Sequence, residues 1–95
     1  MYKIIRTKDF EKSFKRVKGS GKLKKQAREK LVETIATLAK GERLTSEYKD
    51  HQLTGELSHY RECHIKGDLL LVYQIRRSEL LLILVDIGTH SYLGL

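Results

Sequence analysis

Histidine and aspartate residues that could transfer protons gather in the second half of this 95-residue chain. His64 and Asp68 stand on either side of an Ile-Lys-Gly segment, and Asp86 and His90 on either side of an Ile-Gly-Thr segment. Imidazole has an ordinary pKa near neutral pH, so it can accept a proton from one oxygen atom and give a proton to another. Cleavage of RNA needs both transfers, at the 2′-hydroxyl and at the leaving 5′-oxygen, and a cation near the phosphorane. The same residue types are also common as plain surface residues at strand ends.

The charge of the chain is strongly asymmetric. The net charge is +7, but residues 1–30 contain twelve lysine or arginine residues and three acidic residues, a formal charge of +9, whereas residues 31–95 carry −2. Such a field favours a polyanion such as RNA or DNA, and a solvated lysine-rich surface is the alternative. The predicted phosphate-contacting residues, for which we use the name basic block, are Lys12, Lys15, Arg16, Lys22, Lys24, Lys25 and Arg28.

Cysteine content and hydropathy exclude several classes of protein. A lone cysteine, Cys63, cannot form an intramolecular disulfide or a zinc site of several thiolates, and it fits a reducing cytosol. The longest aliphatic run, Leu80–Val85, is far shorter than the ~20 residues that a membrane-spanning helix needs. The N-terminus lacks the apolar stretch of a signal peptide. These features predict one cytoplasmic domain over residues 1–95.

Two helices are predicted to follow a short opening strand. Residues 2–6 favour a strand, and Thr7 can cap the helix that follows. A Gly-Ser-Gly segment ends that helix, and its Ser20 can cap a second helix from about Lys22 to Lys40, with Gly41 at the C-terminal end. Apolar residues recur at helical spacing in both segments. Two amphipathic helices joined by a tight loop indicate a helical hairpin that packs on a sheet.

Three further strands are predicted in the second half, over residues 60–65, 68–75 and 80–87. An irregular polar connection, residues 42–58 with one helical turn near Ser46, precedes them. The short turns between the strands favour an antiparallel meander. The resulting order is β-α-α-β-β-β, which predicts an α+β domain with a helical hairpin packed on a small, mostly antiparallel sheet.

The predicted meander brings the polar residues of interest to one edge of the sheet. One strand ends at His64, the next begins at Asp68, and the last ends just before His90, so these residues and Asp86 are expected near one another. Two registers are possible. A three-residue loop with Gly67 in the left-handed region puts His64 and Asp68 on the same face, and the position of the glycine favours it. A two-residue Lys66-Gly67 turn puts them on opposite faces.

Four motifs, in order along residues 48–91, resemble those of a known family. Residues 48–55, YKDHQLTG, resemble the YKDHxLxG segment of YafQ-type toxins, members of the RelE superfamily. Residues 60–65, YRECHI, resemble their YR(D/E)xHI strand. Residues 68–73, DLLLVY, resemble the strand that follows, and residues 88–90, GTH, the closing G-(T/S)-H. The N-terminal half agrees in element order and basic character.

The resemblance implies a RelE-like fold and a bacterial type II toxin that cleaves mRNA on the ribosome without a metal or another cofactor. By their positions in the motifs, His51, His64, Asp68 and His90 correspond to the family's catalytic residues, which share proton transfer and position the scissile phosphate. The implied partners are the 70S ribosome with its mRNA and a cognate DinJ-like antitoxin, a ribbon-helix-helix protein with an acidic toxin-binding segment. Operator DNA is contacted only through that antitoxin, and no membrane is involved.

Three positions depart from the family pattern. Leu69 stands where an aromatic residue is common, Asp86 where the last strand commonly has an arginine, and Leu93-Gly94-Leu95 where a closing phenylalanine is common. An aspartate cannot stabilise a phosphorane, so Arg61 and Lys66 become the candidates for the cation at the transition state.

Two other functions are compatible with the scaffold. A ParE-type toxin inhibits DNA gyrase without catalysis, but such toxins lack the histidine set that His51, His64 and His90 form here. A degenerate toxin that serves only as antitoxin partner and co-repressor is the other alternative, which the Asp86 departure leaves open. Among the other polar residues, Asp50 and Glu62 are interpreted as groups that orient their neighbours, and His59 as a solvated loop residue.

Overall fold

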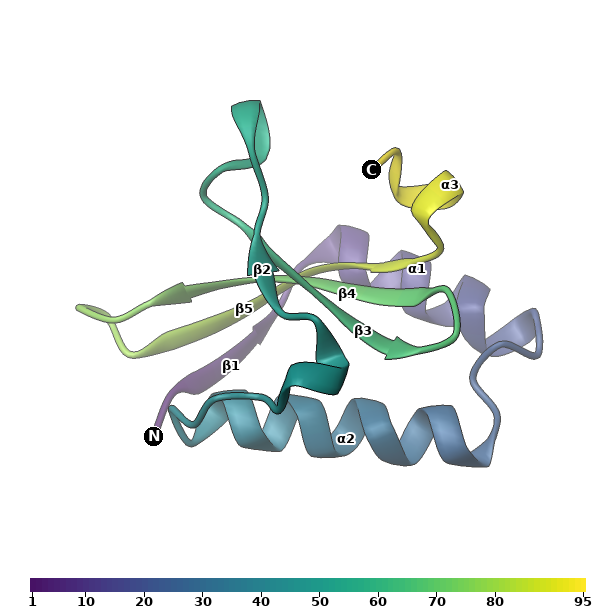
Figure 1. Ribbon diagram of the computed structural model, residues 1–95, viewed down its shortest axis with the longest axis horizontal. Helices are drawn as coiled ribbons and strands as arrows, with labels where there is room; N and C mark the ends of the chain where they lie inside the picture. Colours follow the sequence, from purple (N-terminus) through teal and green to yellow (C-terminus); the bar gives the residue numbers. More distant parts are fainter.

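The computed structural model describes residues 1–95 as one five-stranded sheet with two long helices packed on it. Figure 1 shows α2 below the sheet, with α3 and the segment around residues 53–60 projecting above it. The elements are β1 (Lys3–Arg6), α1 (Lys8–Gly19), α2 (Lys25–Ala39), β2 (His51–Gln52), β3 (Arg61–Lys66), β4 (Leu69–Arg76), β5 (Leu81–Gly88) and α3 (His90–Leu93). Single 3₁₀ turns lie at Ser46–Tyr48 and Gly55–Leu57. The predicted α+β architecture is confirmed.

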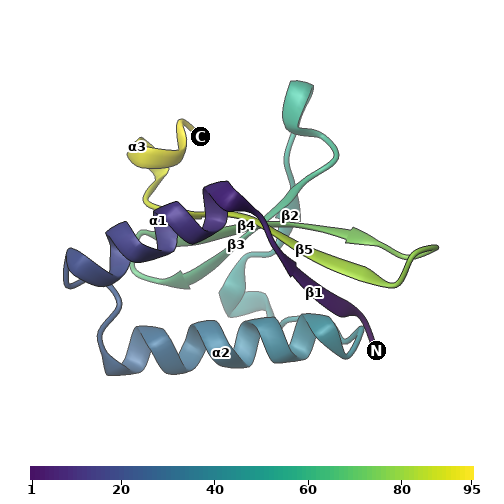
Figure 2. The ribbon, with the colours of Figure 1, turned by 180° about the vertical axis from the view of Figure 1, so that it is seen from behind.

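The sheet has the strand order β1-β5-β4-β3-β2. β1 runs parallel to β5, although α1, α2 and three further strands separate them in the chain, and every other pair is antiparallel. Figure 2 shows α1 on the near side of this sheet, with α2 beneath it. Apolar side chains of both helices share one buried cluster with Cys63, Leu71, Tyr73 and Leu84, so both helices cover the same face. The opposite face is free to carry the site.

The helix ends largely agree with the sequence. The Thr7 hydroxyl caps α1 by accepting a hydrogen bond from the Phe10 backbone N–H, and Gly41 follows α2 in the left-handed region with φ +79°. The expected role of Ser20 is wrong, because its hydroxyl donates back to the Val17 carbonyl and so closes α1. The second helix therefore starts at Lys25, after Lys24, which makes no side-chain cap.

The turn between β3 and β4 follows neither predicted register. The chain turns at Gly67-Asp68, and a β-bulge lies between His64 and Lys66, so that His64 pairs with Leu70 and Lys66 pairs with Leu69. A bulge inserts one residue into a strand and so changes which face the following side chains point to. This single extra residue directs Lys66 and Asp68 away from His64.

Two short elements were absent from the predicted fold. β2 has only two residues, and α3 is a single turn capped by the Thr89 hydroxyl. β2 contains His51, and α3 begins at His90. No helix of the structure is long and apolar enough to span a membrane.

Candidate active site

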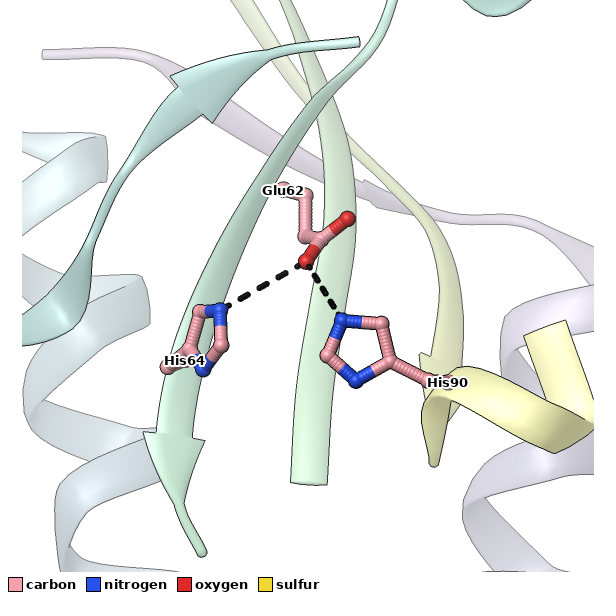
Figure 3. A group of neighbouring side chains, drawn as sticks. All are labelled: Glu62, His64 and His90. Atoms are coloured by element: carbon pink, nitrogen blue, oxygen red, sulfur yellow. Dashed lines mark ion pairs between the residues drawn. The ribbon is translucent and has the colours of Figure 1, made fainter. Parts of the chain in front are cut away.

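Three histidines surround the carboxylate of Glu62 on the face of the sheet opposite the helices. Glu62 and His64 are two residues apart on β3, so they point to the same face. β2 is paired with β3 so that His51 lies directly across from Glu62. His90 is the first residue of α3, which follows β5, and Figure 3 shows its ring and that of His64 directed at the same carboxylate. Residues from three elements thus meet at one acidic group.

The distances describe a compact cluster of ionisable groups. The Nε2 atoms of His64 and His90 each lie 3.6 Å from Oε1 of Glu62, as the dashed lines of Figure 3 mark. Nε2 of His51 lies 3.9 Å from the other carboxylate oxygen. The rings of His64 and His90 are in edge contact, with centroids 5.7 Å apart. Glu62 is only 2% exposed, whereas half of the His90 side chain is open to solvent. A buried anion therefore faces three imidazoles that a substrate can reach.

A backbone contact fixes the orientation of His51. Its Nδ1 lies 2.7 Å from the carbonyl oxygen of Lys49, which can only accept, so Nδ1 carries a proton and donates it. Lys49 holds this carbonyl in place from the left-handed region, with φ +47°, which is uncommon for a residue other than glycine. The other nitrogen, Nε2, is thereby turned toward Glu62.

The surroundings of His64 favour its neutral form. Burial lowers the pKa of His64 below its ordinary value, and the charges of Lys49, His90 and His51 lower it further, while Glu62 opposes them. A histidine that is neutral at physiological pH can accept a proton. Cys63, the neighbouring thiol, is on the other face, and burial raises its pKa to about 12, so it is not a thiolate nucleophile.

Of the two aspartates expected beside the histidines, Asp68 lies apart from them. It is in the Gly67-Asp68 turn with an exposed side chain, and its carboxylate is 3.9 Å from Nζ of Lys22. The expectation for Asp68 is therefore corrected, and the β-bulge with the turn that follows it is the physical reason. Asp86 pairs with Val72, which in turn pairs with Glu62, so Asp86 lies on the histidine face two strands away from Glu62. Its carboxylate accepts a hydrogen bond at 2.9 Å from the backbone N–H of Ile87.

The two candidate cations also point elsewhere. Arg61 is one residue from Glu62 on β3, hence on the helix-covered face, where its Nε donates to Asp50 at 3.2 Å. The Tyr73 hydroxyl donates to the same carboxylate oxygen, which completes a small network on that face. Lys66, after the bulge, extends to the side chain of Gln26 on α2. Neither residue supplies a cation to the histidine cluster in this structure, contrary to the sequence-based expectation.

Sequence reasoning missed Glu62 as the centre of the site. It precedes His64 by two residues, and that spacing in a strand is the signal for a shared face. The missing information was β2, because a two-residue strand has no periodicity, and only its pairing places His51 across from Glu62. Lys49 was also missed; it is the lysine whose charge acts on His64.

The cluster has the composition of a metal site. Glu62, His64 and His90 offer one oxygen and two nitrogen atoms that all lie within 4.8 Å of one another. Two histidines and one glutamate, with a fourth position open to solvent, are a common ligand set for zinc in enzymes. The residues present therefore fit a transition-metal ion as well as metal-free proton transfer.

The basic block forms an exposed surface on α1, on the loop after it and on the start of α2. Two of its members reach toward the histidine side. Lys22 faces Asp68, and the Arg16 guanidinium lies 4.2 Å from the centre of the Tyr92 ring on α3. The positive surface and the histidine cluster thus meet at α3.

A five-stranded sheet with a basic helical hairpin on one face and a histidine cluster on the other defines a small, basic α+β domain. The family described as the bacterial toxin of type II toxin-antitoxin systems, YafQ, matches residues 2–94, and the chain belongs to this family. A putative YafQ toxin of Haemophilus influenzae is 58% identical over 31 residues, which is 33% of this chain and 30% of that protein.

Solved structures resemble the whole chain. A metal-bound toxin from Helicobacter pylori is 42% identical with a TM-score of 0.84, over 98% of this chain and 99% of that one. YafQ in the Escherichia coli DinJ–YafQ complex is 29% identical with a TM-score of 0.81, over 98% of each chain. YafQ from Escherichia coli alone is 26% identical with a TM-score of 0.84, again over 98% of each chain. The fold of the chain therefore agrees with its membership of the YafQ family.

Proposed function

We propose that this toxin is an mRNA endoribonuclease that acts on the ribosome and cleaves RNA by metal-independent acid–base chemistry of its histidines. The observation that carries the proposal is the arrangement of His51, His64 and His90 around the buried carboxylate of Glu62. Such a site places several imidazoles, including His64 with its lowered pKa, within reach of one phosphodiester.

In the proposed reaction, one histidine accepts a proton from the RNA and another donates a proton to it. Neutral His64 accepts the proton of the 2′-hydroxyl, whose oxygen then attacks the adjacent phosphorus atom. The bond from phosphorus to the 5′-oxygen breaks, and protonated His90, the more exposed of the two, gives its proton to that oxygen. The products are a 2′,3′-cyclic phosphate and a 5′-hydroxyl. Glu62 stabilises the imidazolium that forms on His64, and His51 with its fixed orientation supplies further positive charge near the phosphate.

Asp68 has no place in these proton transfers. Its exposed position at the tip of the β3–β4 turn, beside Lys22, suits a contact that positions the substrate instead. In the absence of a last-strand arginine, protonated histidines and Lys49 supply the positive charge that Arg61 and Lys66 were expected to provide.

A metal ion is the specific alternative that the site suggests. The Helicobacter pylori relative is described as metal-bound, and a metal held by Glu62, His64 and His90 would supply an activated water in place of the 2′-hydroxyl. In the proposed mechanism such an ion is an inhibitor, because it occupies the nitrogen atoms that transfer protons. The chemistry of the new RNA ends separates the two reactions.

We also propose an antitoxin partner of the DinJ type, because the Escherichia coli relative is solved in complex with DinJ. An acidic segment of a ribbon-helix-helix antitoxin is complementary to the +9 charge of residues 1–30, which accelerates association at low salt. In this scheme the antitoxin masks the site and makes the contacts with operator DNA.

Expression of the chain alone in a bacterium, with mapping of mRNA ends, tests the function. We expect growth arrest with cuts inside codons, abolished by His64→Ala and by His90→Ala. His59→Ala is the matched control, because His59 is exposed and belongs to a different groove. Arrest with intact mRNA supports a gyrase inhibitor, and no arrest supports a degenerate partner. A folded His90→Ala variant with full toxicity contradicts the proposal.

A further inference from the structure

The last helical turn of the chain is tied to α1 by one aromatic residue, Tyr92. The Tyr92 hydroxyl and the Ser13 hydroxyl on α1 are 2.9 Å apart and share a hydrogen bond. Ser13 is 2% exposed, and its neighbours on the buried side of α1 are Phe10 and Val17. A buried hydroxyl without a partner is unfavourable, so Ser13 and Tyr92 stabilise each other.

The Tyr92 ring is held on further sides. The guanidinium of Arg16 lies 4.2 Å from the ring centroid, a cation–π distance. A Cβ atom added to Gly88 would lie 2.5 Å from Cδ2 of Tyr92, so the ring rests directly on the Gly88 backbone. The Thr89 hydroxyl accepts a hydrogen bond from the Tyr92 backbone N–H. Contacts from α1 and β5 thus converge on the Tyr92 side chain, and the Thr89 cap holds its backbone.

α3 needs such a tie because it has only four residues, His90–Leu93. A helix of one turn does not persist without tertiary contacts. Successive residues of a helix are rotated by about 100°, so His90 and Tyr92, two residues apart, point in nearly opposite directions. When Tyr92 is fixed toward α1, His90 is directed toward β3 and Glu62, as its 3.6 Å contact shows.

We propose that Tyr92 is a positioning residue that holds His90 against the Glu62–His64 pair through its bond to Ser13 and its packing on Gly88. The inference rests on the proposed function, and it explains why a chain without the family's closing phenylalanine still orders its last turn. Displacement of a catalytic group by about 1 Å can lower a rate a hundredfold. Loss of Tyr92 therefore slows the chemical step and leaves ribosome binding intact.

The test measures single-turnover cleavage of mRNA on 70S ribosomes together with the NMR contact between the His64 and His90 rings. Tyr92→Ala is expected to lower the rate constant at saturating ribosomes about a hundredfold, with an unchanged half-saturating concentration and loss of the ring-to-ring NOE. Tyr92→Phe, which keeps the ring, is expected to lower the rate about three- to tenfold. Tyr2→Phe is the control, since its hydroxyl meets only Arg77, at the exposed far end of the sheet.

Gly88→Ala disturbs the position of Tyr92 from β5, because the added methyl group displaces the tyrosine ring. We expect it to reproduce the loss of rate and NOE, and the double variant Gly88→Ala/Tyr92→Ala to be no slower than Tyr92→Ala alone. A parental NOE in Tyr92→Ala, or additive effects in the double variant, overturns the inference. If Tyr92→Ala does not fold, a parental rate and NOE in Tyr92→Phe overturns it. A parent chain that leaves mRNA intact contradicts the proposed function, while the NOE still decides the role of Tyr92.

Discussion

The negative charge of Glu62 acts on all three neighbouring histidines. A carboxylate that is almost fully removed from solvent needs positive charge or hydrogen-bond donors beside it, and the three imidazoles are the groups that can supply them. Burial lowers the pKa of His64 and so favours its neutral form. In the proposed reaction, Glu62 stabilises the imidazolium that forms when His64 takes up a proton.

Replacement of Glu62 by glutamine tests this electrostatic role with little change in shape. Without the negative charge, the imidazolium formed during the reaction loses its stabilising partner. We expect Glu62→Gln to lower the single-turnover cleavage rate about a hundredfold or more. The matched control is Glu56→Gln in the exposed Gly55–Leu57 turn nearby. A near-parental rate in folded Glu62→Gln contradicts the role given to the carboxylate.

The charge of Lys49 acts on the pKa of His64, the base of the proposed reaction. Its positive charge lowers the pKa of His64, so His64 stays neutral to a lower pH than it otherwise would. Activity that needs neutral His64 falls as the pH drops through that pKa. Removal of the charge in Lys49→Gln raises the pKa, and the acidic limb of the pH–rate profile is expected to move to higher pH. NMR titration of the histidine rings measures the shift, with Lys40→Gln as control; a limb that stays or moves lower argues against this effect.

At the scale of elements, Thr7 connects the start of α1 to the strand that leads to His90. Its hydroxyl accepts from the Phe10 N–H at 3.1 Å and donates to the Leu84 carbonyl of β5 at 2.9 Å. Thr7→Ala removes both bonds, and we expect the free energy of unfolding to fall by about 1–2 kcal/mol. Urea denaturation measures this change. Thr45→Ala provides the comparison, because Thr45 occupies an N-cap without a side-chain cap bond; equal losses in the two variants contradict the account of α1.

The long elements were predictable because each has a period and an end signal. The apolar spacing of α1, its Thr7 cap and the glycine after α2 all act locally, so the sequence alone identifies them. The short elements depend on tertiary contacts instead. β2 exists because His51 and Gln52 pair with β3, and α3 because Tyr92 packs on α1. These contacts join residues far apart in the chain, and the Thr89 cap of α3 is the local signal that accompanies them.

The site, like the fold, was predictable only in part. The histidines were identified by motif, and the meander correctly brings His64 and His90 together. A strand reverses its face at every residue, so one bulge was enough to direct Lys66 and Asp68 away from the cluster. The position of Arg61 follows from the same alternation, since Glu62, its neighbour, is the residue that faces the histidines.

The whole molecule combines a positive helical face with a histidine cluster on the opposite side of the sheet. α1 and α2 carry the basic block, and Arg16 and Lys22 link it to α3 and to the β3–β4 turn. A surface of this kind binds phosphates with little reading of sequence. Ribosomal RNA is the polyanion that the proposed function supplies, so the basic block would hold the toxin while the histidines act on the mRNA.

Charge reversal measures the contribution of this surface. Lys12, Lys15, Lys24 and Lys25 are changed to Glu, while Arg16 and Lys22 are kept because they contact Tyr92 and Asp68. We expect weaker ribosome binding and a salt dependence that is flatter by about 0.7–0.9 per lost phosphate contact. The control reverses Lys40, Arg43, Arg76 and Arg77, which gives the same formal charge of −1 instead of +7. If both variants bind equally, the net charge and not the basic block decides the affinity.

The chemistry of the cut ends tests the central claim most directly. A defined mRNA on 70S ribosomes is incubated with the purified toxin, and both new ends are analysed. Attack by the 2′-hydroxyl predicts a 2′,3′-cyclic phosphate or 3′-phosphate on the upstream fragment and a 5′-hydroxyl on the downstream fragment, with neither formed by His64→Ala or His90→Ala. A 3′-hydroxyl upstream with a 5′-phosphate downstream contradicts the account, because those ends come from attack by water, which a metal held by Glu62, His64 and His90 would activate.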